Sequence, residues 1–241
     1  MNYIIFNDKD SRDVKGLLIS ELPPIRKPNM RAKETVIDGV DGSIIEELGY
    51  ESYDKTVIIG LKIGADVDKV TEFFTGSGKV VFSNEPDKYY IATIIKNIDY
   101  ERLLRYKVAK VTFRVQPFKY NRVELPRTFS MLETPEKTSM VVENIGNHTA
   151  KPLITIRLNA TLGNSIFKLT VNGKDVFTYD FTESYKSDVV IDSEKQDAYC
   201  GDILKNRYMT GEFPIFEKGN NVVSWSGVIE SIKIERYSRW L

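Results

Sequence analysis

Hydrophobic and polar residues alternate most regularly between Tyr106 and Tyr120. Apolar side chains take every second position there and polar ones lie between them: Ala109, Val111, Phe113 and Val115 against Lys110, Thr112, Arg114 and Gln116. A period of two is typical of a strand with one buried face, so we predict a central strand. Pro117 has no amide hydrogen to give to a neighbouring strand, and we expect the chain to leave the sheet at that residue.

This exit from the sheet predicts two domains, residues 1–126 and 127–241. The first is expected to be a mainly β sheet or sandwich with one α-helix. Its other predicted strands are Met1–Phe6, Leu17–Ile19, Tyr50–Ile63, Lys79–Ser83 and Tyr89–Ile98. The helix should begin after Asp66 as its N-cap, with Val67, Val70, Phe73 and Phe74 on one stripe, and end at Gly76.

A proline-rich segment interrupts the first domain. Pro23, Pro24 and Pro28 exclude a helix and predict an extended, exposed arm. The basic residues in and after it are Arg26, Lys27, Arg31 and Lys33, which form either solvated surface or a contact with an acidic partner. Two Asp-Gly pairs in Val36–Ser43 predict turns, and a calcium loop is disfavoured because the distal glutamate is missing.

Residues 127–241 show a different pattern, in which many short predicted strands are separated by turn residues such as Asn172-Gly173. This spacing favours an antiparallel β-sandwich. The predicted strands are Met140–Glu143, Pro152–Leu158, Ile166–Val171, Val176–Phe181, Val189–Ile191, Asn221–Ser226 and Ile229–Tyr237.

The amino-acid composition excludes or disfavours several classes of function. Cys200 is the only cysteine and His148 the only histidine. A disulfide framework and a multi-cysteine metal site are therefore excluded, and histidine-dependent catalysis depends on one residue. The 34 basic residues balance the 34 acidic ones, which does not favour a nucleic-acid-binding surface. We expect a soluble protein without signal peptide, membrane insertion, metal or cofactor.

Several pieces, in this order, resemble the distal tail proteins (Dit) of long-tailed, non-contractile bacteriophages and prophages, the siphovirus-type tail components. The proline-rich arm, the turn Val36–Gly42 and the strand Thr56–Ile63 come first. The later pieces are Gly78–Phe82, Tyr89-Tyr90, Gln116–Tyr120, Glu143–Asn147, Ala150–Ile154, Val190–Asp192, Gly211–Pro214, Gly219–Asn221 and Ile234–Leu241.

The resemblance implies a structural protein of the virion tail tip, assembled in the bacterial cytoplasm, and not an enzyme. Proteins of this family form a hexameric ring from their N-terminal domains, as one ring or two rings back to back. Galectin-like or carbohydrate-module-like C-terminal sandwiches surround it. The ring joins the major tail protein to the tail-associated baseplate-hub protein and leaves a channel for DNA ejection. In some members the outer domains carry a receptor-binding protein.

Ring subunits need exposed edges or arms that meet a neighbouring copy. The arm and the segment Glu46–Tyr53 are candidates, with the residues Arg26, Arg31, Tyr50 and Tyr53; the other interpretation is a local loop.

A lectin-like host-adhesion module is the second hypothesis. Aromatic rings of the sandwich could stack on a sugar or contact a partner, and the candidates are Trp225, Trp240, Tyr208 and Tyr185. Trp225 lies near the end of a predicted strand, which also suits a core position. The acidic pairs, such as Asp38 and Asp41, are close in sequence, but a glycosidase needs carboxylates from separate elements.

Overall fold

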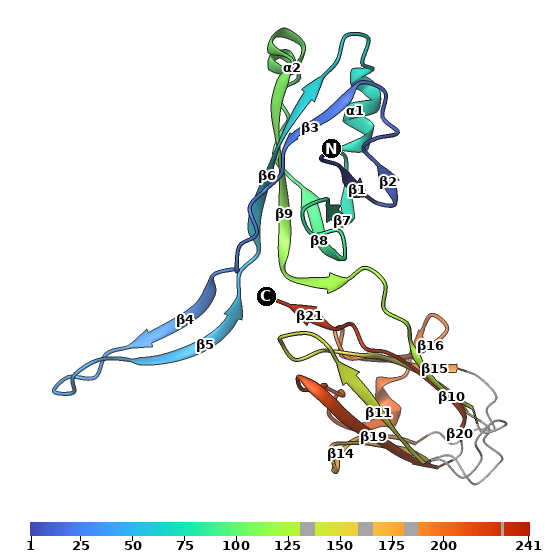
Figure 1. Cartoon of the computed structure of the whole chain (residues 1–241). Coiled ribbons are helices and arrows are strands. Elements are labelled where there is room, and N and C mark those ends of the chain that lie inside the picture. The colour runs from blue at the N-terminus through green and yellow to red at the C-terminus, as the bar shows by residue number, and fades with distance from the viewer. Residues whose placement is uncertain (131–137, 159–165, 181–187, 228) are drawn as a thin grey trace. The chain divides into compact units, whose positions relative to one another are not determined.

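A computed structural model describes residues 1–130, 138–158, 166–180, 188–227 and 229–241 (Figure 1). They confirm the mainly β class, since strands follow one another along the whole chain. The chain forms two compact units, Met1–Arg122 together with Leu241, and Val123–Trp240. The division between these units falls between Arg122 and Val123. No helix in the described part of the chain is long and apolar enough to cross a membrane.

The first unit is built on an antiparallel sheet in which β9 is central, as predicted. The strand order is β2-β1-β7-β8-β9-β6-β3. The bounds are β1 Ile4–Phe6, β2 Lys9–Asp10, β3 Leu17–Glu21, β6 Tyr53–Leu61, β7 Ser77–Phe82, β8 Lys88–Ile94 and β9 Val108–Asn121.

One face of this sheet forms the core under helix α1, Val67–Phe73. The rings of Phe6 and Phe82 meet Phe113 of β9 edge to face, at centroid distances of 5.5 and 5.6 Å. The predicted N-cap is confirmed, because the Asp66 carboxylate accepts from the amides of Asp68 and Lys69 at 3.1 and 3.3 Å.

The expectation of a single helix was wrong. A second helix, α2, covers Tyr100–Tyr106 between β8 and β9. Its core contact is made by Leu103, which is fully buried, whereas Leu104 and Tyr106 are exposed. A helix of two turns with so little apolar periodicity leaves a weak signal in the sequence.

The expectation that the chain leaves the sheet at Pro117 was also wrong. Strand β9 continues to Asn121, and Tyr120 pairs with Tyr89 of β8. Pairing with β6 ends at Val115, and the register with β8 shifts between Tyr90 and Ala92, opposite Pro117. The missing amide hydrogen of Pro117 therefore falls at an irregularity in the pairing, where a proline is tolerated.

A long hairpin leaves the body of this unit between β3 and β6. Its strands are β4, Met30–Thr35, and β5, Ile44–Tyr50, which form a two-stranded sheet of their own. Figure 1 shows the ribbon extending away from the end of β6 that is opposite α2. The Asp-Gly turns between the strands are confirmed, with Gly39 and Gly42 at φ values of 80° and 87°.

The second unit is a sandwich of two antiparallel sheets, as predicted. One sheet has the order β10-β20-β12-β15-β16-β17 and the other β11-β19-β13-β14-β18. The bounds are β10 Arg127–Ser130, β11 Ser139–Asn144, β12 Leu153–Leu158, β13 Ile166–Val171, β14 Lys174–Asp180, β15 Asp188–Asp192, β16 Asp197–Cys200, β17 Ile203–Leu204, β18 Met209–Gly211, β19 Gly219–Gly227 and β20 Ile229–Glu235. A further short strand, β21 Arg239–Trp240, belongs to neither of these sheets. Both sheets contribute to one apolar core.

Candidate functional site: an exposed hairpin arm

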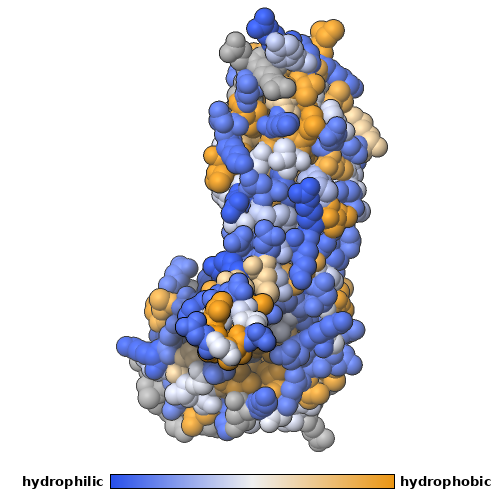
Figure 2. Space-filling model, turned by 90° about the vertical axis from the view of Figure 1, so that its left-hand side faces the viewer, coloured by the Kyte–Doolittle hydropathy of each residue, from blue (hydrophilic) through white to orange (hydrophobic). Residues whose placement is uncertain are grey.

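The hairpin, which we call the arm, is the segment Asn29–Gly49. Every residue in it is exposed. Seven of these are large and apolar, with exposed fractions between 42% and 70%: Met30, Val36, Ile37, Val40, Ile44, Ile45 and Leu48. Figure 2 faces the side from which the arm projects and shows orange apolar side chains among blue polar ones there. The arm therefore has no core of its own. A two-stranded hairpin without a buried face is at best marginally stable in water.

Apolar side chains cover both faces of the arm. Ile44 and Ile45 are adjacent in β5 and therefore point to opposite faces, where their cross-strand partners are Thr35 and Glu34. If the ribbon packed with one face on the body of its own chain, its apolar residues would be concentrated on that face. Apolar residues on both faces suit a segment that is enclosed from two sides.

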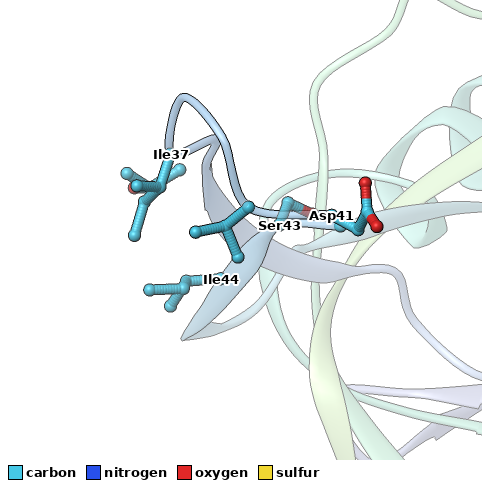
Figure 3. A pocket seen from close by; sticks show the side chains of 7 residues that line it. Ile37, Asp41, Ser43 and Ile44 are labelled. Carbon is cyan, nitrogen blue, oxygen red and sulfur yellow. The ribbon is translucent and has the colours of Figure 1, made fainter.

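The tip of the arm contains a shallow hollow of about 100 Å³, lined by Thr35, Ile37, Val40, Asp41, Gly42, Ser43 and Ile44. Figure 3 shows the side chains of Ile37 and Ile44 on the same side of the turn, with the carboxylate of Asp41 pointing away from them. The hydroxyl of Ser43 donates to the Glu34 carboxylate at 2.6 Å and ties the two strands together below the tip. The hollow has room for one apolar side chain.

The arm is acidic, and the rest of its unit is basic. Two basic residues, Arg31 and Lys33, are outnumbered in the arm by Glu34, Asp38, Asp41, Glu46 and Glu47. Residues 1–28 and 50–122 carry eighteen basic and thirteen acidic side chains. The near neutrality of the whole chain therefore conceals two regions of opposite sign.

The segment Pro23–Pro28, which we call the arm root, is held to the body by side-chain donors. The Asn84 amide donates to the carbonyl of Pro23 at 2.9 Å, and the Lys55 ammonium donates to that of Pro24 at 3.1 Å. The Tyr53 hydroxyl lies 3.3 Å from the carbonyl of Arg26. These contacts fix the direction in which the arm leaves the body.

Lys55 is the most unusual of these donors because it is only 2% exposed. Its ammonium lies 4.6 Å from the centre of the Tyr90 ring. Burial lowers the pKa of Lys55 to about 8, and the negative charge of the Glu85 carboxylate offsets part of this lowering. That carboxylate is itself bound by the Tyr90 hydroxyl and the Lys119 ammonium, both at 2.5 Å.

The structure brings the four predicted interface residues together at the arm and its root. Arg31 lies in β4 and donates to the carbonyl of Leu48 across the ribbon at 3.0 Å. Tyr50 ends β5, and its ring meets Phe118 edge to face at 5.9 Å. Tyr53 begins β6, and burial raises its pKa to about 12. Arg26 is exposed in the root, beside Tyr53.

The aromatic residues considered for sugar binding lie in different settings. Trp225 is 6% exposed and packs on Phe129 at a centroid distance of 4.8 Å, so its ring belongs to the sandwich core. Tyr208 is half-buried, with the Arg207 guanidinium 4.6 Å from its ring centre. Trp240 is half-buried in β21. Tyr185 lies outside the described residues. Within those described, Trp225 offers little ring face for a sugar.

The sequence interpretation missed the apolar residues of the arm. It placed the site on the arginines and tyrosines and treated Glu46–Tyr53 as a loop or a contact segment. The signal that could have found them was Ile44-Ile45 in a stretch that is otherwise charged, directly after the Asp-Gly turns. Two adjacent isoleucines in a strand cannot share one face, so one of them needs a second partner.

No protein-family model and no curated protein matches the chain. Among solved structures it is similar to the Dit protein of phage SPP1, described as a paradigm of the hub adsorption apparatus in phages that infect Gram-positive bacteria. The TM-score is 0.70 at 13% identity, over 97% of both chains. The chain has the fold of SPP1 Dit. A chain of the phage P2 baseplate in its activated, calcium-bound conformation is also similar, with a TM-score of 0.55 at 9% identity over 98% of both chains.

This likeness extends over both units. At such low identity the comparison concerns the fold alone. What the arm does must be argued from its own residues.

Proposed function

We propose that this chain is a structural protein of a phage tail tip, and that its arm joins it to further copies of the same chain. The observation that carries the proposal is the arm itself, in which every residue from Asn29 to Gly49 is exposed and seven are large and apolar. A ribbon of this kind gains its stability from the surface that covers it.

A further copy is the partner that best fits the charges. The arm has an excess of acidic side chains, and the body from which it extends has an excess of basic ones. An arm that lies on the body of the next copy joins two different surfaces, which is a head-to-tail contact. Such a contact closes into a ring when the rotation between copies is a simple fraction of a turn.

We propose a ring of six copies around a channel that lets DNA pass. This number and this arrangement follow the resemblance to distal tail proteins, and the shared fold with SPP1 Dit supports them. In the same proposal the ring contacts the major tail protein on one side and the baseplate-hub protein on the other. The sandwich unit, Val123–Trp240, would then be available to a receptor-binding protein. We assign no catalytic role to the chain.

The test is the mass of the purified chain in solution, measured by light scattering and negative-stain microscopy. The wild type should form rings. Ile44→Asp with Ile45→Asp places a charge on each face of the arm and should give monomers of unchanged fold. Ile215→Asp is the matched control, because Ile215 is 48% exposed in the sandwich unit, and it should leave the rings intact. A wild type that remains monomeric at high concentration would overturn the proposal.

A further inference from the structure

The arm root covers a buried positive charge. Lys55 is 2% exposed, and its ammonium lies between 4.6 and 5.9 Å from the centres of three aromatic rings of the body, those of Tyr90, Phe82 and Tyr53. From the root, the carbonyl of Pro24 accepts a hydrogen bond from this ammonium at 3.1 Å. The charge is thus enclosed between the rings of the body and the backbone of the root.

No carboxylate pairs with this charge directly. In the part of the chain that the structure describes, Lys55 takes part in no ion pair and makes one hydrogen bond, to the root. The carboxylate of Glu85 attracts it from a distance, but that group is already bound by Lys119 and Tyr90. The positive charges of Lys119 and Arg26 act against it. An ammonium has three donors, and burying it with so few partners costs free energy.

The root is attached to the body by its two ends and by side chains. Pro23 and Pro28 are buried, whereas the residues between them are exposed. Among the described residues, no hydrogen bond from backbone to backbone joins the root to the body. The contacts that hold it come from the side chains of Asn84, Lys55 and Tyr53. The root can therefore detach by losing these contacts, while β6 keeps its pairing with β3 and β9.

We propose that the arm root is a proton-linked hinge, which opens readily while Lys55 carries its charge and is held closed once that charge is lost. The open root returns the ammonium to water and lets the arm pivot without unfolding of the sheet. Loss of the proton removes the cost of burying a charge, and the neutral amine still has hydrogens to donate to the Pro24 carbonyl. The hinge belongs to the single chain and does not depend on assembly.

The direction of the pH dependence follows from two protonation equilibria. In the closed root, burial lowers the pKa of Lys55 to about 8, and in the open root water restores the ordinary value of 10.5. Below pH 8 both forms are protonated, so the ratio of open to closed root is constant. Between pH 8 and 10.5 the closed form has lost a proton that the open form keeps. The ratio therefore falls about tenfold for each pH unit.

Trypsin cleavage between Arg26 and Lys27 measures the opening, because proteolysis follows the population of the detached segment. Lys55→Met has a side chain of similar length without a proton to lose. Dividing the wild-type cleavage rate by that of Lys55→Met at each pH cancels the pH profile of trypsin. This ratio should stay constant from pH 6 to 7 and fall about tenfold from pH 7 to 9. Lys33→Met, at an exposed lysine of the arm, is the matched control, and the ratio of wild type to this variant should not change.

A second variant tests whether cleavage requires the root to detach. Asn84→Ala removes the amide that binds the Pro23 carbonyl and leaves Lys55 in place, so it should speed cleavage by roughly two- to tenfold at both pH 7 and pH 9. Asn2→Ala removes a similar bond outside the root, to the carbonyl of Ser20, and should be cut at the wild-type rate.

All rates are measured in dilute solution by mass spectrometry, with circular dichroism to confirm the fold of each variant. A ratio of wild type to Lys55→Met that stays constant or rises between pH 7 and 9 would overturn the hinge. Cleavage of Asn84→Ala at the wild-type rate would overturn it as well. Neither result bears on the proposed function, which is tested by the formation of rings.

Discussion

Two hairpins of this chain both turn through glycines at positive φ and differ in what lies beside them. The hairpin β13–β14 turns at Asn172-Gly173 and pairs with β19 on one side and β18 on the other. Its inward side chains are at most 5% exposed: Phe167, Leu169, Val171, Phe177 and Tyr179. The arm hairpin β4–β5 also turns through glycines at positive φ, but its two strands pair with each other in a sheet of two.

The difference shows that turn residues and β-prone strands are enough to form a hairpin, whereas a third strand and a second layer are needed to bury it. In β13–β14 the sandwich supplies both within one chain. In the arm the chain supplies neither a third strand nor a second layer, and in our proposal a further copy supplies the covering surface. The arm is therefore expected to contribute to assembly and not to the stability of the folded unit.

The largest expected effect is on stability. Phe177→Ala removes a ring that is 1% exposed and should lower the free energy of unfolding of the sandwich unit. The expected loss is about 3–5 kcal/mol, since the mutation leaves a cavity in a packed core. Ile44→Ala in the arm should change unfolding by less than about 0.5 kcal/mol. Urea titration of the two variants measures the contrast, and equal losses would remove the distinction between the hairpins.

The next effect concerns the arm root, where the exposed hairpin meets the core. Burial lowers the pKa of Lys55 to about 8 in the folded chain, from an ordinary value of 10.5. Between these values the unfolded chain binds a proton that the folded chain has lost, so stability should rise with pH above about 8. Below about 8 both states are protonated and the contribution is constant.

Lys55→Met should remove this rise, which urea titrations at several alkaline pH values would detect as a difference from the wild type. Lys33→Met, at an exposed lysine of the arm, is the matched control and should reproduce the wild-type curve. A wild-type stability that falls through the same range, with the fall abolished by Lys55→Met, would contradict the expected direction of the pH dependence.

The smallest expected effect compares the turns. Gly173 has a φ of 77°, and Gly173→Ala should lower the free energy of unfolding of the sandwich by about 1–2 kcal/mol. Gly39 has a φ of 80°, and Gly39→Ala strains its backbone in the same way. Because the arm adds nothing to the stability of the body, the second variant should unfold as the wild type does. A loss of similar size in both would show that the arm is part of the cooperative unit.

Much of the fold follows from the sequence wherever one face of an element is buried. The alternation around Phe113 locates β9, and Asp66 with its apolar stripe locates α1. The errors arise where burial is slight or where the tertiary partner decides. In helix α2, Leu103 is buried whereas Leu104 and Tyr106 are exposed, and Pro117 remains in its strand because β8 shifts register opposite it.

The candidate site was predictable only in part. The Asp-Gly turns of the arm were predicted, and Arg26, Arg31, Tyr50 and Tyr53 are found at the arm and its root. The proline-rich segment was expected to be exposed, and this was wrong for Pro23 and Pro28, which are buried. The importance of Ile44 and Ile45 depends on their exposure, which periodicity cannot give when a strand has no buried face.

Hydrogen–deuterium exchange of the wild type, at concentrations below and above assembly, tests the central claim most directly. The arm amides should exchange at nearly unprotected rates in the dilute monomer and become protected in the assembled form, while β13–β14 stays protected in both. Arm amides that are already protected in the monomer, or that stay unprotected in the assembly, would contradict the account.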